Sequence, residues 1–343
     1  MNGTAATAIP NSAMSRRQIL AGTAAMALLG AAGSARGELI AQPEPLSAPV
    51  KLTIGVNKVP HFCPVDRVPA MLKSMNIECE VAVFARYADT RTAMASGSID
   101  LGAIGPADVP ISVAQGLDTV VGLMGLGISP KNPIVRTGIA VDQWSDLEGK
   151  RVGIAPGSAV WFQFAATLDE VDVPYSKLQI VNIQGGGMPF VQSMQRGDID
   201  AFMGWEPFES MAIADNLATR VTKLDYSKSK AVGAELGLLG AHKDAISSKH
   251  EAVRRFVWAY LKAQDEVSQS KDELAKAVAQ FTGLDPKFAP AVASTLTLGQ
   301  FLTIEQVQRQ AQAFYKFGVI PKDVSADLPK FFNTDLIRSV QKA

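Results

Sequence analysis

The feature that most constrains this chain is a repeated alternation of short β-branched runs with segments of helical length. Four such runs follow Lys51, and a second set of four begins at Arg151. The eight predicted strands are 52–56, 80–84, 100–104, 119–123, 151–155, 178–183, 199–204 and 220–224. Strands that alternate with helices predict an α/β fold with mostly parallel, doubly wound sheets.

An internal echo indicates that the two sets are similar units. Ala93–Asp100 reads AMASGSID, and Ser193–Asp200 reads SMQRGDID. In both segments a glycine can take the left-handed cap of a helix, and Ile-Asp opens the next strand. The next strand ends in glycine both times, at Gly105 and Gly204. The alternative is that this is only a commonplace helix–glycine–strand junction.

The C-terminal third changes character and predicts helices. Ser248 with Glu251, and Thr303 with Gln306, each form the pattern of a capping box that starts a helix. Apolar residues after both boxes keep a helical period, so we expect these helices to be structural core.

The N-terminus has the layout of an export signal. Arg16 and Arg17 precede a weakly apolar run, 21–32, and small residues follow it. The run is much shorter than the ~20 residues that span a bilayer. The adjacent arginines resemble a twin-arginine signal. We therefore expect residues 1–35 to be a cleaved signal with no lipid anchor, and the proline-containing segment 36–49 to be a flexible lead-in.

Charge and composition exclude several classes. The chain has 33 basic and 33 acidic residues, and removal of 1–35 takes two arginines and no acid, which leaves a net charge of −2. Such a balance argues against nucleic-acid binding, and any bound anion must be held by local groups. Two Cys and three scattered His predict no metal site. No phosphate-binding loop or serine elbow occurs, so we expect no cofactor and no catalytic residue of those kinds.

Four motifs together resemble a known family. They are Ala95–Asp100 with Gly105, Asp146–Gly153 (DLEGKRVG), Pro156-Gly157-Ser158 opening a helix, and Gly197–Ala201 leading to Trp205-Glu206-Pro207. In this order, behind an export signal, they resemble the periplasmic substrate-binding proteins of ABC importers, in the sulfonate/nitrate/taurine-binding group. The resemblance covers about residues 51–224, with a generic helical tail beyond.

The resemblance implies a type II periplasmic-binding-protein fold with two hinged lobes, mixed doubly wound sheets and a helical C-terminal part. Lobe one is then 50–138 with 238–343, and lobe two is 139–237, with crossings near 134–141 and 236–241. It also implies a monomer that captures a small organic anion, with sulfonate as first choice, and delivers it to an importer permease and its ATPase. Taurine, nitrate and aromatic carboxylates stay open, because fold does not settle the ligand.

Ligands of parallel α/β sheets collect beyond the carboxyl ends of the strands, where helix N-termini present free amides. This rule selects residues after three strands of each set. The predicted ligand-binding residues are His61, Phe62, Arg86, Gly105 and Pro106 in lobe one, and Ser158, Ala159, Trp161, Gly187, Trp205 and Glu206 in lobe two.

Each of these residues also has a plainer interpretation. Ser158 can hold an anion at a helix start or be an ordinary N-cap. Trp161 can wall the cleft or lie in the core, and Glu206 can accept from an amine, bridge the lobes or begin a helix. Asp108 is expected to cap its own helix, since Pro110 suits only a first turn.

An enzyme is the alternative function. Cys63 follows the first strand, and the sequence there looks similar to sulfinate desulfinases of the same fold, which use a Cys nucleophile supported by His and Arg. His61 and Arg86 are the possible partners of Cys63. No His follows the second strand, which favours a binding protein. Cys79 lies several residues short of the strand end, so we expect two free thiols rather than a disulfide.

Overall fold

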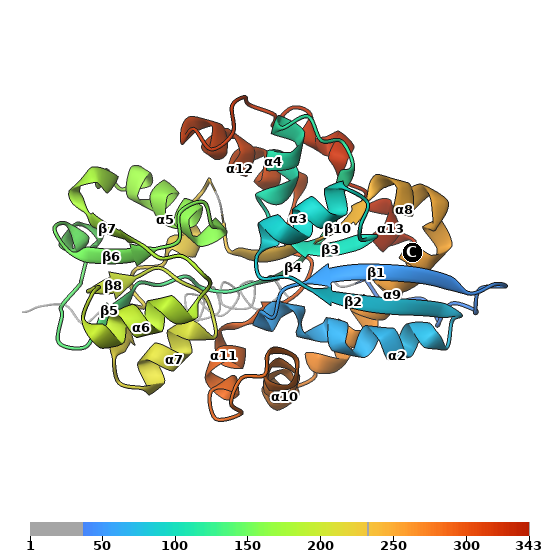
Figure 1. Cartoon of the computed structure of the whole chain (residues 1–343), viewed down its shortest axis with the longest axis horizontal. Coiled ribbons are helices and arrows are strands. Elements are labelled where there is room, and N and C mark those ends of the chain that lie inside the picture. The colour runs from blue at the N-terminus through green and yellow to red at the C-terminus, as the bar shows by residue number, and fades with distance from the viewer. Residues whose placement is uncertain (1–36, 232, 343) are drawn as a thin grey trace, which may run out of the picture. The chain divides into compact units, whose positions relative to one another are not determined.

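The computed structural model describes residues 37–231 and 233–342, and the predicted export signal lies outside them. Strands and helices alternate as the pattern predicts from Val50 to Arg220, and helices dominate afterwards (Figure 1). No helix of the described residues is long and apolar enough to cross a membrane.

A six-stranded sheet has the order β11-β4-β10-β3-β1-β2. Strand β1 runs parallel to its neighbours β2 and β3, whereas β10 pairs antiparallel with β3 and β4, and β11 pairs antiparallel with β4. The strands of this first sheet are β1 (Val50–Val56), β2 (Ile77–Val83), β3 (Leu101–Ile104), β4 (Val120–Ile128), β10 (Glu235–His242) and β11 (Thr297–Leu298).

A five-stranded sheet has the order β7-β6-β8-β5-β9. Its strands are β5 (Ile134–Arg136), β6 (Arg151–Ile154), β7 (Gln179–Asn182), β8 (Ala201–Phe202) and β9 (Ala218–Arg220). β6 runs parallel to β7 and β8, and β5 pairs antiparallel with β8 and β9. The two sheets thus share an arrangement, because β2-β1-β3-β10 in the first sheet corresponds to β7-β6-β8-β5 in the second, with three parallel strands followed by one antiparallel strand.

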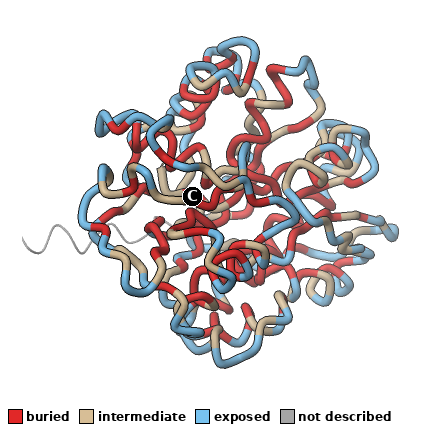
Figure 2. Tube along the Cα trace, turned by 60° about the vertical axis from the view of Figure 1, so that its left-hand side comes forward, coloured by how far each residue is buried: buried red, intermediate tan, exposed pale blue. Residues whose placement is uncertain are grey.

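Helices cover both faces of each sheet, so the folds are doubly wound (Figure 1). Buried segments lie along the interior elements and exposed ones at the outer turns (Figure 2). The helices of the first sheet are α2 (Val68–Lys73), α3 (Tyr87–Ala95), α4 (Asp108–Ala114), α8 (Lys243–Ser248), α9 (His250–Val267), α10 (Lys271–Thr282), α11 (Ala289–Thr295), α12 (Ile304–Lys316) and α13 (Asp335–Arg338). Those of the second sheet are α5 (Ala159–Glu170), α6 (Met188–Arg196) and α7 (Phe208–Ala214), and short 3-10 turns occur at 60–67, 144–147, 175–177, 226–228 and 328–331.

The predicted echo has the same structural role in both sheets. Gly97 and Gly197 have φ values of +74° and +84°, the left-handed conformation expected after a helix. The carboxylate of Asp100 accepts the amide of Thr53 at 2.9 Å, and that of Asp200 accepts the amide of Arg151 at 3.0 Å. Each aspartate therefore ties the third strand of its set to the first.

Two expectations about helix starts have opposite outcomes. Thr303 caps α12 by accepting the amide of Gln306 at 3.2 Å, as predicted. The box at Ser248 is wrong, because its hydroxyl donates to the carbonyl of Asp244 at 2.6 Å and closes α8. Lys249 is the cap of α9.

Two segments connect the sheets, 129–133 and 221–234 with residue 232 left out, and their described residues run beside one another. The backbone of Lys131 donates to the Asp225 carboxylate at 3.1 Å and accepts the amide of Tyr226 at 2.8 Å. The crossings thus precede the predicted ones, because Ile134 already pairs with Arg220 in the second sheet and Glu235 with Ile128 in the first. The predicted lobe limits at 138 and 238 stay predictions.

Candidate functional site

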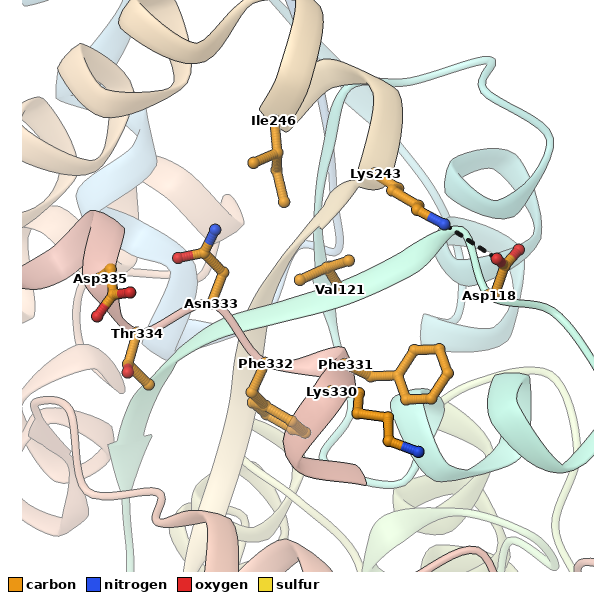
Figure 3. A pocket seen from close by; sticks show the side chains of 10 residues that line it. All are labelled: Asp118, Val121, Lys243, Ile246, Lys330, Phe331, Phe332, Asn333, Thr334 and Asp335. Atoms are coloured by element: carbon orange, nitrogen blue, oxygen red, sulfur yellow. Dashed lines mark hydrogen bonds and ion pairs between the residues drawn. The ribbon is translucent and has the colours of Figure 1, made fainter. Parts of the chain in front are cut away.

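One surface pocket, of about 570 Å³, lies against the first sheet between α8, β4 and the segment 330–335 (Figure 3). Its lysines have partners: Lys243 pairs with Asp118 at 3.0 Å and Lys330 with Asp327 at 3.0 Å. These are exposed surface pairs, which contribute little energy and select no ligand. The two lysines of this pocket are therefore not free cations.

A second cavity, of about 360 Å³, lies where the strands of both sheets end. It contains seven of the eleven predicted site residues. The predicted residues that line it are His61, Arg86, Gly105, Ser158, Ala159, Trp205 and Glu206. The rule that ligands collect at strand carboxyl ends thus selects segments that share one cavity.

The N-terminus of α5 forms one wall. The hydroxyl of Ser158 accepts the amide of Trp161 at 3.1 Å, so Ser158 is the predicted N-cap. Gly157 has φ +77°, a conformation suited to glycine. Ala159 and Val160 line the cavity, and their amides have no hydrogen-bond partner in the described residues. Free amides at the positive end of a helix attract an anionic group.

A buried polar chain forms the wall of the first sheet. The Tyr87 hydroxyl donates to the carbonyl of Leu236 at 3.1 Å and lies 2.9 Å from His61 Nε2. Its single proton is used, so His61 Nε2 donates to it. Burial and the Lys131 charge lower the pKa of His61 to about 3, so the ring is neutral near pH 7. These hydrogen bonds orient His61, and the neutral ring adds no positive charge to the cavity.

The arginines near the cavity are already paired. Arg86 is exposed and pairs with Asp89 at 2.8 Å. Arg91 pairs with buried Asp108 at 2.6 Å, and the other Asp108 oxygen accepts the amide of Gly105 at 2.7 Å. The expectation that Asp108 caps α4 is wrong, since Ala107 holds that position. Asp108 instead ties α3 to the end of β3.

An acidic cluster follows β8. Glu206 accepts the Ser210 amide at 3.0 Å and Arg220 Nη2 at 2.7 Å, while Glu209 accepts Arg220 Nη1 at 2.8 Å. Burial and Glu206 raise the pKa of Glu209. Glu206 thus supports the start of α7, which is one of its plainer interpretations, and Trp205 lies edge-on to Phe190 with ring centroids 5.4 Å apart. Two acids share one arginine here.

Lys131 is the functional candidate that the sequence patterns missed. It lies on the connecting segment, is 5% exposed and lines the cavity. Burial lowers the pKa of its amine, and the nearby acids only partly offset this. Within the described part of the chain, the amine has neither an ion pair nor a hydrogen bond. The available signal was a Lys between two prolines, Pro130 and Pro133, just before the predicted crossing at 134–141.

Four predicted site residues do not line the cavity. Phe62 is buried beneath His61 and Tyr87, and Pro106 is buried. The indole N–H of Trp161 donates to the Tyr175 hydroxyl at 3.0 Å. Gly187 packs so tightly on Phe208 that a Cβ would lie 1.9 Å from its ring. Their roles toward a ligand stay predictions.

The cysteines are free thiols, as predicted. Cys63 is 1% exposed and does not line the cavity. Burial raises its pKa to about 12, which is opposite to what a nucleophilic thiolate needs. The desulfinase alternative is therefore not favoured. Across 37–231 and 233–342, no group of three His, Cys, Asp or Glu side chains has the arrangement of a metal site.

Residues 72–273 match the family model described as NMT1/THI5 like. No curated protein matches the sequence. Among solved structures, the alkanesulfonate-binding protein SsuA from Xanthomonas axonopodis pv. citri, bound to MOPS, superposes with TM-score 0.70 at 19% identity, over 84% of this chain and 100% of that chain. The periplasmic nitrate-binding protein NrtA from Synechocystis PCC 6803 gives TM-score 0.66 at 15% identity, over 87% and 89%.

A mutant of DszB in complex with biphenyl-2-sulfinic acid shares the fold as well, with TM-score 0.64 and 14% identity over 86% of this chain and 99% of that chain. At these low sequence identities, the similarity shows the fold alone. They confirm the predicted two-sheet periplasmic-binding-protein fold.

Proposed function

This chain belongs to the NMT1/THI5-like family, and from that premise we propose that it is an exported substrate-binding protein. It captures a small organic anion, sulfonate-like as first choice, and delivers it to an ABC importer permease and its ATPase. It acts as a periplasmic monomer after removal of residues 1–35. Similarity to the sulfonate-binding and nitrate-binding proteins supports this class of function.

One observation carries the proposal: the cavity joins the free amides of α5 to the buried, unpaired amine of Lys131. A buried amine without a counter-ion is costly to the protein, and an anionic ligand removes that cost. The arginines of the same cavity have acidic partners, so they add little attraction. Lys131 and the helix end are therefore the proposed anion site, with Ser158 as the residue that shapes it.

The proposed motion is closure about the two connecting segments. They are the chain's passages between the sheets and are hydrogen-bonded to each other at Lys131. A ligand that contacts both sheets favours the closed arrangement, which a permease can distinguish from the open one.

A thermal-shift panel tests the proposal. The purified protein is heated with alkyl and aryl sulfonates, taurine, nitrate and phthalate-type acids. A ligand at 100 times its Kd adds about 2.7 kcal/mol to the folded state. We expect at least one organic anion to raise Tm in a concentration-dependent way. A panel in which no organic anion raises Tm contradicts the proposal.

A further inference from the structure

Helix α5, which begins at the proposed anion site, is shared by two hydrophobic cores. Val160, Phe164 and Leu168 pack in the core of the second sheet. Phe162 lies two residues from Val160 and from Phe164, hence on the opposite side of the helix. It belongs to a core cluster that includes Phe314 of α12 and apolar residues of β3, β4 and β10. Direct packing therefore joins α5 to the first sheet, in addition to the two connecting segments.

The contact between α5 and α12 has an apolar part and a charged part. Phe162 and Phe314 are 0% and 1% exposed, and their ring centroids are 4.1 Å apart. Two turns further along α5, Asp169 forms an ion pair with Lys316, and these side chains are 45% and 61% exposed. Buried aromatic rings contribute most of the energy of such a contact, whereas an exposed ion pair contributes little and favours one alignment of the helices.

The second connecting segment is held between the same two helices. At the end of α5, Glu170 accepts the Ser229 hydroxyl at 2.9 Å. The same carboxylate accepts the amides of Lys230 and Ala231, each at 3.3 Å. From α12, Arg309 donates to the carbonyl of Lys230 at 3.2 Å. These contacts form one layer from α5 through the segment to α12, and the layer fixes where α5 lies relative to the first sheet.

The anion site depends on this placement, because its groups come from different elements. The amides of Ala159 and Val160 come from α5, and the amine of Lys131 comes from the first connecting segment. In the next turn of α5, Gln163 donates to the carbonyl of Gly233 on the second connecting segment at 2.6 Å. A binding site has to be held within about 0.5 Å of its productive geometry, so a small shift of α5 relative to Lys131 weakens binding.

We infer that α12 positions the anion site, and that Phe314 and Lys316 are its positioning residues. Neither residue lines the cavity. They act through α5, whose N-terminus they hold in place relative to Lys131. The inference rests on the proposed function, because it assigns both residues a role in binding the same ligand. A smaller fraction of correctly arranged protein lowers the affinity for every ligand by one common factor, and this is the signature of a positioning role.

A charge swap tests the inference without a change in the core. Asp169→Lys places two lysines at the exposed end of the contact, and Asp169→Lys combined with Lys316→Asp restores an ion pair in reverse order. Asp327→Lys is the matched control, because it makes the same reversal at an exposed pair with Lys330, which lies away from α5. By titration calorimetry with propanesulfonate, benzenesulfonate and taurine, we expect Asp169→Lys to raise each measurable Kd by the same factor, about two- to tenfold. The reversed pair should restore the Kd values, and the control should leave them unchanged.

A second pair of variants tests the apolar part. Phe314→Leu loosens the contact with Phe162 and is expected to raise each Kd by a common factor of up to about tenfold. Phe256→Leu makes the same change at a phenylalanine of α9 that is 0% exposed and packs in a core cluster without residues of α5. The control should lower Tm and keep every Kd.

The outcomes separate the inference from the proposed function. If the probes bind and neither Asp169→Lys nor Phe314→Leu raises Kd, the inference is overturned and the proposed function stands. A Kd that rises in only one of the two variants, or that the reversed pair does not restore, overturns the role of the residue concerned. Absence of binding by all three probes contradicts the proposed function, and small-angle X-ray scattering of the ligand-free protein then decides the inference. We expect a larger radius of gyration in Phe314→Leu than in Phe256→Leu, and equal radii overturn the inference.

Discussion

Replacing Lys131 with Met isolates the group on which anion capture depends. Methionine keeps the length and the apolar stem of the side chain and removes the amine. The amine is buried and lacks a partner among the described residues, so its interaction with a bound anion is not diluted by a competing ion pair. A hydrogen bond to a charged group contributes about 1.5–3 kcal/mol, which corresponds to an increase in Kd of about 10- to 150-fold.

The same substitution has an opposite effect on the empty protein. Because burial lowers the pKa of Lys131, the folded state disfavours its charged form. Between the folded-state pKa and 10.5, the unfolded chain binds more protons, so the free energy of unfolding rises with pH through that window. Below the folded-state pKa the amine is charged in both states, and its burial lowers the free energy of unfolding by an amount that no longer changes with pH. Lys131→Met is therefore expected to raise the Tm of the ligand-free protein.

The assay is titration calorimetry with the strongest ligand of the thermal-shift panel, together with Tm of the ligand-free variant. Lys243→Met is the matched control, because it removes an exposed lysine paired with Asp118 at the other pocket (Figure 3). We expect Lys243→Met to leave Kd unchanged. An unchanged Kd in Lys131→Met, or a lowered Tm without ligand, would refute the reasoning.

Three further predictions concern reactivity and stability. The thiol of Cys63 is buried and its pKa is raised to about 12, so it should react with a thiol reagent at pH 8 only after the protein unfolds. Cys63→Ser should bind the ligand with unchanged affinity. Rapid labelling of the native protein would favour the enzyme alternative. Asp200→Asn weakens three hydrogen bonds from Arg151, so it should lower the free energy of unfolding in urea by about 1–3 kcal/mol. The control Asp198→Asn breaks only an exposed pair with Arg196 and should lower that free energy by about 0–1 kcal/mol. Equal losses in the two variants would contradict the role of Asp200 in tying two strands together. Burial raises the pKa of Glu235 from 4.5 to about 7, so the folded state keeps this proton to a higher pH than the unfolded state does. The free energy of unfolding should therefore fall as pH rises from 4.5 to 7. Glu235→Gln should flatten that slope in Tm measured from pH 4.5 to 7, and an unaltered slope would assign it to other groups.

Local patterns predicted the parts of the site that depend on local backbone. Ser158 follows glycine at a helix start, and the N-cap hydrogen bond depends only on neighbours three residues away. The echo around Gly97 and Gly197 likewise encodes a helix end and a strand start within eight residues. Strand ends then placed seven of the eleven predicted residues in the lining, since parallel strands bring their carboxyl ends to one edge.

The features that depend on distant partners could not be predicted in the same way. Trp161 is one turn into α5, yet its indole finds the Tyr175 hydroxyl, which the chain supplies from a separate turn. Lys131 and Gln163 look like ordinary surface residues until the two connecting segments and α5 bury them. Ser248 and Glu251 match the local pattern of a capping box, but the Ser248 hydroxyl donates to the carbonyl of Asp244 instead, because Ser248 is the last residue of α8.

The central claim is that a small organic acid binds in the cavity shared by both sheets. Amide hydrogen exchange of the protein with and without the strongest ligand of the thermal-shift panel at saturation tests it most directly. We predict slower exchange on ligand addition at 57–61, which follows β1 of the first sheet, at 129–131 in the connecting segment and at 157–163 around the start of α5. Protection confined to 330–335 at the surface pocket, or to one sheet alone, would contradict it.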